Sequence, residues 1–285
     1  MRALLFAGLA VGLSVSASAQ SATWFPIPSD RDAISLTARH ILFDGDRFPD
    51  GTGYSALSST WFLGTRTSLS SRVRVVTDLP FVTASLETSA SQFDVSESTL
   101  GNPFIGLEVS VPSEQIQSTL GFGGRVPLVG TVFDLEEFVA LQYGLNSDYN
   151  RLGSFPSDVT TLVGTARARY APTPDLAVTG GLTPQLLIPI SSQASLDDPE
   201  LFGGYFFRAE ISTGPALLSA GVSGIGILTE DIGRGASRFE HELGVAAEFE
   251  SGPVRPGAFV ILPIGGDRPE VINAIVGLGA SFSFD

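Results

Sequence analysis

Cysteine and lysine are both absent from the 285 residues, so all sixteen basic side chains are arginine. Without cysteine the chain has no disulfide, thiolate metal site or cysteine nucleophile, and without lysine it has no Schiff-base amine. Charged residues make up only 16% of the chain, against about 25% in a typical soluble domain. The 30 acidic residues outnumber the basic ones and leave a net charge of −14. A chain this acidic is a poor partner for nucleic acid, whose phosphates repel it.

Apolar residues and glycine are what the sequence has in abundance. Hydrophobic residues account for 43% of the chain and glycine for 32 of its 285 positions, where an average protein has about 7% glycine. The chain is apolar, glycine-rich and poor in charge, yet its few charges are strongly unbalanced. This composition indicates one fold with an apolar part and a separate charged part.

The first nineteen residues have the three parts of a secretory signal peptide. Arg2 supplies the charged start, residues 4–15 form the apolar run, and Ala17-Ser18-Ala19 is the small-residue cleavage site. An uncleaved anchor helix would need about 20 apolar residues, and serines at positions 14, 16 and 18 interrupt the run too early. We therefore expect an exported mature chain.

Alternation of apolar with small or polar residues identifies strands. Between residues 271 and 284 every even position is apolar, and most odd positions are glycine, serine or asparagine. The same period of two runs through residues 238–250, where apolar side chains alternate with arginine and glutamate. A period of two is the pattern of a β-strand with two different faces.

Twelve alternating or apolar segments follow one another along the chain, and most of them contain ten to fifteen residues. Soluble strands usually have about 5 to 6 residues, whereas about 9 to 11 are needed to cross a bilayer at a tilt. Residues 211–229 carry no charge but contain Gly214-Pro215 and further glycines, so we interpret them as two strands around a turn rather than a helix. The twelve segments lie near residues 32–43, 54–64, 69–84, 102–111, 116–128, 158–171, 175–189, 201–213, 215–228, 238–250, 254–264 and 271–284.

The connections between these segments alternate in length. Short ones lie at 64–68, 112–115, 172–174, 214 and 251–253, and long polar ones at 44–53, 85–101, 129–157, 190–200, 229–237 and 265–270. Short periplasmic turns, longer external loops and an even strand number are typical of bacterial outer-membrane barrels. A sheet that spans a membrane must also close, because lipid cannot pair its backbone groups.

The sequence therefore predicts an all-β protein, a transmembrane antiparallel up-and-down β-barrel of about twelve strands whose lumen is lined by arginine and glutamate. We expect a signal peptide at 1–19, a short periplasmic N-terminal segment at 20–31 and the barrel at 32–285. A soluble exported β-sandwich, whose strands also alternate, is the alternative fold.

Charged residues of one parity are expected to face the lumen, because an arginine on the lipid face costs about 2 to 4 kcal/mol at mid-depth. Strand direction gathers most of these charges in the periplasmic half. They would form either a network of cross-strand ion pairs that braces the wall or a charged constriction that selects solutes. The predicted lumen-lining residues are Arg72, Arg74, Asp78, Glu108, Arg125, Arg167, Arg169, Arg208, Glu210, Arg238, Glu240, Glu242, Glu248 and Glu250.

Four prolines flanked by apolar residues lie on the inward parity near the external ends of outward-running segments: Pro80, Pro127, Pro189 and Pro263. Proline has no N–H to donate to a ladder, so we expect pairing to end or bulge at this external rim, or the rim to narrow for function. Near the C-terminus, Gly279-x-x-Phe282-x-Phe284 looks like the assembly signal of bacterial outer-membrane proteins. That signal implies the barrel-assembly machinery as a partner.

No arrangement in the sequence predicts catalysis or a cofactor. His40 and His241 fall on the lipid parity near external strand ends and lack the neighbouring serine of a hydrolytic dyad. The motifs Gly-x-Ser-x-Gly and HExxH and a phosphate-binding glycine loop are absent. In the longest loop, residues 133–145 have the composition of a helical turn or two, whose placement the sequence does not reveal.

Residues 100–108 (Leu-Gly-Asn-Pro-Phe-Ile-Gly-Leu-Glu) and residues 123–130 (Gly-Gly-Arg-Val-Pro-Leu-Val-Gly) resemble the phenol meta-degradation pathway family of outer-membrane transporters. In that family a turn leads into a Gly-Leu strand, and the following strand closes with proline and glycine. Residues 69–82 resemble the preceding family hairpin, so the likeness covers about residues 68–130. The resemblance implies passive uptake of small, often aromatic or hydrophobic, molecules, and no catalytic residues.

The net charge is concentrated in the six long loops. With the third loop extended to residue 158, they hold 18 acidic residues and four arginines, a net charge of 4 − 18 = −14, while the remaining twelve acids and twelve arginines cancel. We call these loop charges the acidic crown. We expect it to bind divalent cations, or to favour cations and neutral solutes over anions.

Together these features predict a monomeric barrel, surrounded by outer-membrane lipid, through which small-molecule solutes pass without an energy source. Twelve strands would leave a narrow lumen, between the filled or single-ligand interiors of about 8 strands and the aqueous channels of about 16 to 18. The alternative function is a structural or adhesive surface barrel with a plugged lumen, whose acidic loops bind cations or partners.

Overall fold

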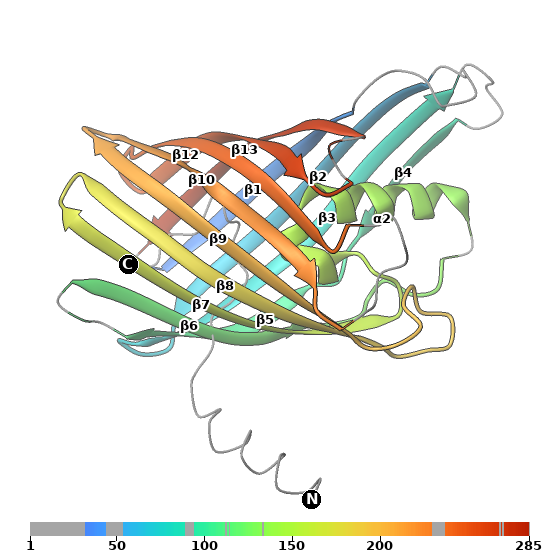
Figure 1. The fold of residues 1–285 in the computed structure, drawn as a ribbon, viewed down its shortest axis with the longest axis horizontal. Coiled ribbons are helices and arrows are strands. Elements are labelled where there is room, and N and C mark those ends of the chain that lie inside the picture. Colours follow the sequence, from blue (N-terminus) through green and yellow to red (C-terminus); the bar gives the residue numbers. More distant parts are fainter. Residues whose placement is uncertain are drawn as a thin grey trace, which may run out of the picture.

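Thirteen strands form one closed antiparallel sheet in the described part of the computed structural model (Figure 1). The structure describes residues 32–284 apart from 44–53, 89–93, 112, 114, 133, 230–236, 268 and 270, so the predicted signal peptide at 1–19 and segment at 20–31 lie outside it. The strands are β1 (Asp32–Phe43), β2 (Tyr54–Ser68), β3 (Val73–Thr88), β4 (Val95–Leu100), β5 (Phe104–Val111), β6 (Ile116–Arg125), β7 (Val159–Thr173), β8 (Leu176–Pro189), β9 (Glu200–Thr213), β10 (Ala216–Ile227), β11 (Phe239–Phe249), β12 (Val254–Gly265) and β13 (Ile272–Phe284).

The sheet closes through its first and last strands. β1 pairs with β2 on one side and with β13 on the other, in a register that runs from Asp32↔Phe284 to Phe43↔Ile272. Both β4 and β5 pair with β3 and together make one passage across the sheet, so the thirteen strands amount to twelve crossings. Closure leaves no strand edge to lipid, and the predicted twelve-stranded barrel is confirmed.

The predicted segments match the strands closely, with two corrections near β3. β2 continues to Ser68, so the first short turn lies after residue 68 rather than at 64–68. The loop predicted at 85–101 contains the end of β3 and the whole of β4. β4 could not be recognised in the sequence, because its residues Val-Ser-Glu-Ser-Thr-Leu are mostly polar on both faces and lack a clear apolar alternation.

The gap between β4 and β5 is caused by Gly101, Asn102 and Pro103. On the facing strand Pro80 has no N–H for the ladder, and its carbonyl accepts a hydrogen bond from the Gly101 N–H at 2.9 Å. A side chain at Gly101 would collide with the Ser154 carbonyl oxygen. Beyond this point β6 has ended, and the helix α2 (Leu135–Ser147) packs against β4 instead.

The alternation in the last strand slips by one residue. The even positions of β13 were predicted to share one apolar face, and Phe282 and Phe284 are indeed exposed, but Ile272 is buried inside the barrel together with Ile275. The ladder with β1 shifts register between Leu42 and Phe43. This bulge moves the inward parity from odd to even positions near the external end.

Residues 211–229 form two strands, as predicted. β9 ends at Thr213, Gly214 has a φ of +58°, and β10 begins at Ala216. Positive φ is easily adopted by glycine, which has no Cβ. Within the described residues, neither helix has the length and apolar character to cross a membrane.

Asp158 fastens the loops before β7 and after β8. Its φ of 53° is the one positive value at a described non-glycine residue, and its Oδ2 accepts hydrogen bonds from Thr131 Oγ1 at 2.6 Å and Ser191 Oγ at 3.1 Å. We expect Asp158→Ala to destabilise the barrel by about 2 kcal/mol, because alanine loses both bonds and keeps the strained backbone. Asp158→Gly should cost less, and urea unfolding in detergent micelles will rank the two variants.

Candidate functional site

A loop segment folds into the lumen at one end of the barrel. Residues 135–154, which we call the plug, comprise α2 and the 3-10 helix η1 (Tyr149–Ser154). α2 contacts β1, β2, β3 and β4, and η1 contacts β7, β8 and β10, so the plug spans the barrel at the end opposite the C-terminus (Figure 1). The sequence predicted one or two helical turns in this loop; α2 is longer, with 13 residues.

Apolar side chains hold the plug against β2 and β3. Phe155, just after the plug, meets Phe62 of β2 edge to face, with ring centroids 6.5 Å apart. The buried cluster around them contains Phe62, Val82, Ala84, Val129, Ala140, Leu141 and Phe155. These buried apolar contacts hold α2 against the β2–β3 side of the barrel wall.

A chain of alternating charges fixes the turn between α2 and η1. Asp148 in that turn has Oδ2 at 2.8 Å from Nη2 of Arg39 and 3.7 Å from Nε of Arg151. Arg151 in turn lies 3.8 Å from Oδ1 of Asp78, whose Oδ2 accepts a hydrogen bond from Arg125 at 2.9 Å. All five side chains are buried. This charge chain connects the plug to β1, β3 and β6.

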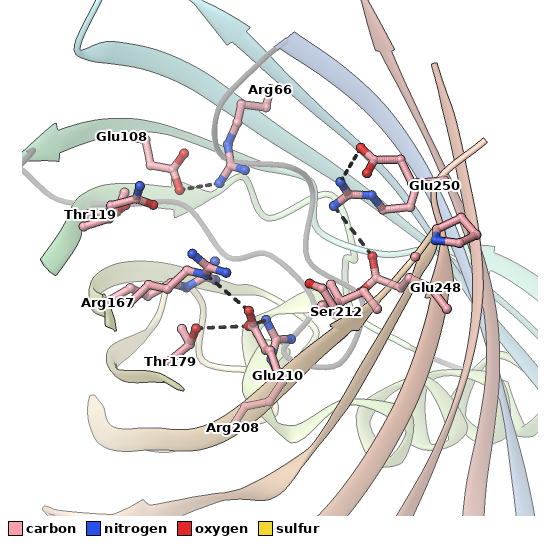
Figure 2. Close-up of a pocket in the computed structure, with 17 residues that line it drawn as sticks. Arg66, Glu108, Thr119, Arg167, Thr179, Arg208, Glu210, Ser212, Glu248 and Glu250 are labelled. Carbon is pink, nitrogen blue, oxygen red and sulfur yellow. Dashed lines mark hydrogen bonds and ion pairs between the residues drawn. The ribbon is translucent and has the colours of Figure 1, made fainter. Parts of the chain in front are cut away.

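At the other end of the barrel the lumen contains a cavity of about 410 Å³, which we call the vestibule (Figure 2). Its lining includes Gly214 and Pro215 of the short β9–β10 turn, and short turns face the periplasm in barrels of this kind. This rule predicts that the vestibule faces the periplasmic side. Its polar lining consists of Arg66, Glu108, Gln117, Thr119, Arg167, Arg169, Thr179, Arg208, Glu210, Ser212, Glu248, Glu250 and Arg255.

The side of the vestibule formed by β7 and β9 is basic. Arg167 and Arg169 belong to β7, and Arg208 and Glu210 belong to β9. Glu210 accepts hydrogen bonds from Arg208 Nη2 at 2.6 Å, Arg169 Nε at 3.2 Å and the Thr179 hydroxyl at 3.0 Å. One carboxylate among three guanidinium groups leaves this side with a net charge of 3 − 1 = +2.

The side formed by β11 and β12 has the opposite balance. Arg255 of β12 lies 4.0 Å from Glu248 and 3.1 Å from Glu250, so the net charge is 1 − 2 = −1. The Glu248 side chain is 3% exposed, and its Oε2 accepts no hydrogen bond from the described residues. A third sector holds a neutral pair, in which Arg66 donates to Glu108 at 2.5 Å.

The structure brings seven of the predicted lumen residues together in the vestibule: Glu108, Arg167, Arg169, Arg208, Glu210, Glu248 and Glu250. Asp78 and Arg125 lie instead in the charge chain beside the plug. Arg74 is buried and donates to Ser110 at 3.0 Å.

The remaining predicted lumen residues lie towards the strand ends. Glu242 is buried and accepts a hydrogen bond from Ser223 at 2.6 Å, and half-buried Glu240 accepts one from the Asp267 N–H at 2.9 Å. Arg72 and Arg238 are both exposed, the first in the β2–β3 turn and the second just before β11. Neither of these two arginines lines the vestibule.

Five charged residues of the lumen were missed by sequence reasoning: Arg39, Arg66, Asp148, Arg151 and Arg255. Arg39 and Arg66 share the inward parity of their strands with buried serine and threonine residues. The alternation of polar and apolar residues along these two strands could therefore have placed both arginines in the lumen. Asp148 was assigned to the acidic crown together with Arg151. Both are buried in the lumen, which corrects that assignment, because the loop that carries them folds inward.

The four prolines predicted at the rim each lie where pairing changes. Pro127 comes two residues after the end of β6, and Pro189 is the last residue of β8. Pro263 pairs with Glu242 beside a register shift, and Pro80 lies between the parts of β3 that pair with β5 and with β4.

The two histidines lie in different parts of the barrel wall and contact other residues there. The Tyr205 hydroxyl lies 2.6 Å from Nδ1 of His241, and Nδ1 of His40 contacts the Ser58 carbonyl oxygen. No cluster of three or more histidine, aspartate or glutamate residues suited to a metal ion occurs in the part of the chain that the structure describes.

No protein-family model matches the chain, and comparison with curated protein sequences finds no match. Among solved structures, an outer-membrane channel from Pseudomonas putida F1 superposes with a TM-score of 0.60 at 9% identity, covering 94% of this chain and 100% of that one. The NanC porin superposes with a TM-score of 0.50 at 8% identity, covering 87% of this chain and 100% of the porin. At such low identities the likeness concerns the fold. By fold, this chain is an outer-membrane β-barrel.

Proposed function

We propose that this barrel is a passive channel through which small solutes cross the outer membrane, with the plug as its gate. The observation that carries the proposal is the vestibule, a charged cavity of about 410 Å³ inside the lumen. Cavities that bind small molecules typically measure about 300–1,000 Å³. The resemblance at residues 68–130 extends the proposal to aromatic or hydrophobic solutes, and passage of this kind requires no enzymatic activity.

Conductance of the purified protein in planar bilayers tests the proposal. The native barrel should show stepwise openings, and a variant with residues 135–154 replaced by a short Gly-Ser linker should show larger ones. Heat-modifiable migration on a detergent gel verifies that each variant remains a folded barrel. Folded native and linker proteins that both pass neither ions nor solutes would refute the channel.

A structural or adhesive surface barrel is the second candidate, favoured by the buried charge chain that fastens the plug. Under this hypothesis the plug seals the lumen permanently, and the external loops bind partners. The linker variant would then lose binding to cells or matrix, while the native protein would remain silent in bilayers.

The acidic crown should make the channel prefer cations at low salt. Exposed charges act over about 10 Å at 0.1 M salt and about 3 Å at 1 M, so the preference should fade as salt rises. Reversal potentials measured across KCl gradients at both ionic strengths will show this change. Neutralising Glu136 and Glu137 in the first turn of α2 should weaken the low-salt preference, and a preference for anions that is independent of salt would contradict it.

A further inference from the structure

The two charged sides of the vestibule make it a candidate binding site for a solute that carries charges of both signs. The β7–β9 side has a net charge of +2 and the β11–β12 side a net charge of −1, as counted above. Figure 2 shows Arg167, Arg208 and Glu210 in one part of the cavity and Glu248 and Glu250 in another. A solute in the cavity therefore meets side chains of both charges, grouped in different parts of the lining.

We propose that the vestibule binds small zwitterions, with the carboxylate directed to the arginines of β7 and β9 and the ammonium group directed to Glu248. The inference rests on the proposed passage of small solutes for its biological role. Binding itself can be measured without passage.

Hydrogen-bonding capacity on the basic side suits a carboxylate. Arg208 uses Nε and Nη2 for one oxygen of Glu210, and Arg169 uses Nε for the other oxygen. A guanidinium group has five N–H donors, and Arg169 uses one of them for Glu210, so this arginine has donors left for a ligand. The Arg169 side chain is 38% exposed, which leaves it accessible from the cavity.

The acidic side suits an ammonium group for a complementary reason. Glu248 is buried, its Oε2 accepts no hydrogen bond from the described residues, and Nη1 of Arg255 is 4.0 Å away. A buried carboxylate oxygen without a donor is costly, and the N–H groups of a ligand would satisfy it. Arg255 itself lies closer to the exposed Glu250, at 3.1 Å.

A simple anion or a simple cation would fit less well. An anion beside Arg167 would lie within a cavity that also contains Glu248, Glu250 and two further glutamates. A cation beside Glu248 would share the cavity with five arginines. Only a dipolar solute gains from both sides at once, and a charge separation of a few carbon atoms allows it to reach both.

Three probes of nearly equal size test the inference: 4-aminobutyrate, butyrate and butylammonium. Their binding to the folded barrel in detergent micelles is measured by saturation-transfer NMR and equilibrium dialysis. We expect 4-aminobutyrate to bind about tenfold more tightly than either singly charged probe, the order expected for one additional partly buried charge contact.

Two variants separate the contributions of the two sides. Arg169→Gln should weaken 4-aminobutyrate about tenfold and improve butylammonium, and Glu248→Gln should weaken 4-aminobutyrate similarly and improve butyrate. The matched controls are Arg72→Gln and Glu87→Gln, which change charge at exposed positions outside the cavity and should alter none of the three affinities.

The inference is overturned if butyrate or butylammonium binds the native barrel as tightly as 4-aminobutyrate, or if none of the probes binds. It is also overturned if the control variants change the affinities as much as the vestibule variants do. Selective binding of 4-aminobutyrate by a barrel that never conducts would instead refute the proposed channel and leave the binding site standing.

Discussion

Replacing Asp148 with asparagine will release the plug and raise the conductance of the barrel several-fold. The native carboxylate lies between two buried arginines, 2.8 Å from Arg39 and 3.7 Å from Arg151. Asparagine preserves the shape of the side chain but leaves both guanidinium groups facing an uncharged amide. Removing one partner from a buried pair costs about 3–5 kcal/mol, and outward movement of the plug relieves that cost by exposing Arg151 to water.

Single-channel recordings in planar bilayers measure this effect. Asp134→Asn is the matched control, because it removes the same charge from the same loop at the exposed N-cap of α2, where asparagine caps as well as aspartate. The double variant Arg39→Gln with Asp148→Asn should reverse part of the increase, since it removes both members of the shorter pair but leaves Arg151 facing the amide. A single variant with the same conductance as the native protein would show that apolar contacts alone hold the plug.

The barrel itself was predictable because lipid imposes a simple rule on every strand. One parity must be apolar, and strand length must match the membrane, so the period of two in residues such as 239–249 reveals strand position without knowledge of the partner strands. The same parity placed seven charged residues on the walls of a single cavity. The net balance of each side of that cavity required the structure, because it depends on which strands are neighbours and on Arg66 and Arg255, which the sequence prediction missed.

The plug was not predictable for the opposite reason. Residues 135–154 show no period that distinguishes a loop in water from a loop in the lumen, and their burial depends on partners far away in sequence. Asp148 illustrates this, since its partner Arg39 is 109 residues earlier in the chain. Asp148 was counted with the external charge because sequence distance alone provides no reason to pair the two. Long-range ion pairs of this type become visible only when closure of the barrel brings β1 beneath the third loop.

Asn102 is the residue whose loss should destabilise the barrel most among the uncharged positions of the lumen. Its side chain is fully buried and makes four hydrogen bonds to backbone groups. The amide nitrogen donates to the carbonyl oxygens of Gly153 at 3.3 Å and Pro156 at 2.8 Å, and the amide oxygen accepts from the N–H groups of Leu128 at 2.8 Å and Val129 at 2.9 Å. The gap between β4 and β5, the end of the plug and the chain after β6 therefore meet at one carboxamide.

Replacing Asn102 with alanine should reduce the free energy of unfolding by about 3–5 kcal/mol, because four backbone groups would lose their partner in a buried position. Urea-dependent loss of the heat-modifiable band in detergent micelles measures the change. Gln193→Ala, which removes a carboxamide at an exposed position between β8 and β9, is the matched control and should fall within about 0.5 kcal/mol of the native protein. Asn102→Asp keeps the accepting oxygen but loses both donated bonds, and it places a charge in a buried site. If the aspartate variant is as stable as the native barrel, the bonds that Asn102 donates to Gly153 and Pro156 do not contribute to stability. The stabilisation by Asn102 would then come from the two bonds that it accepts from the chain after β6.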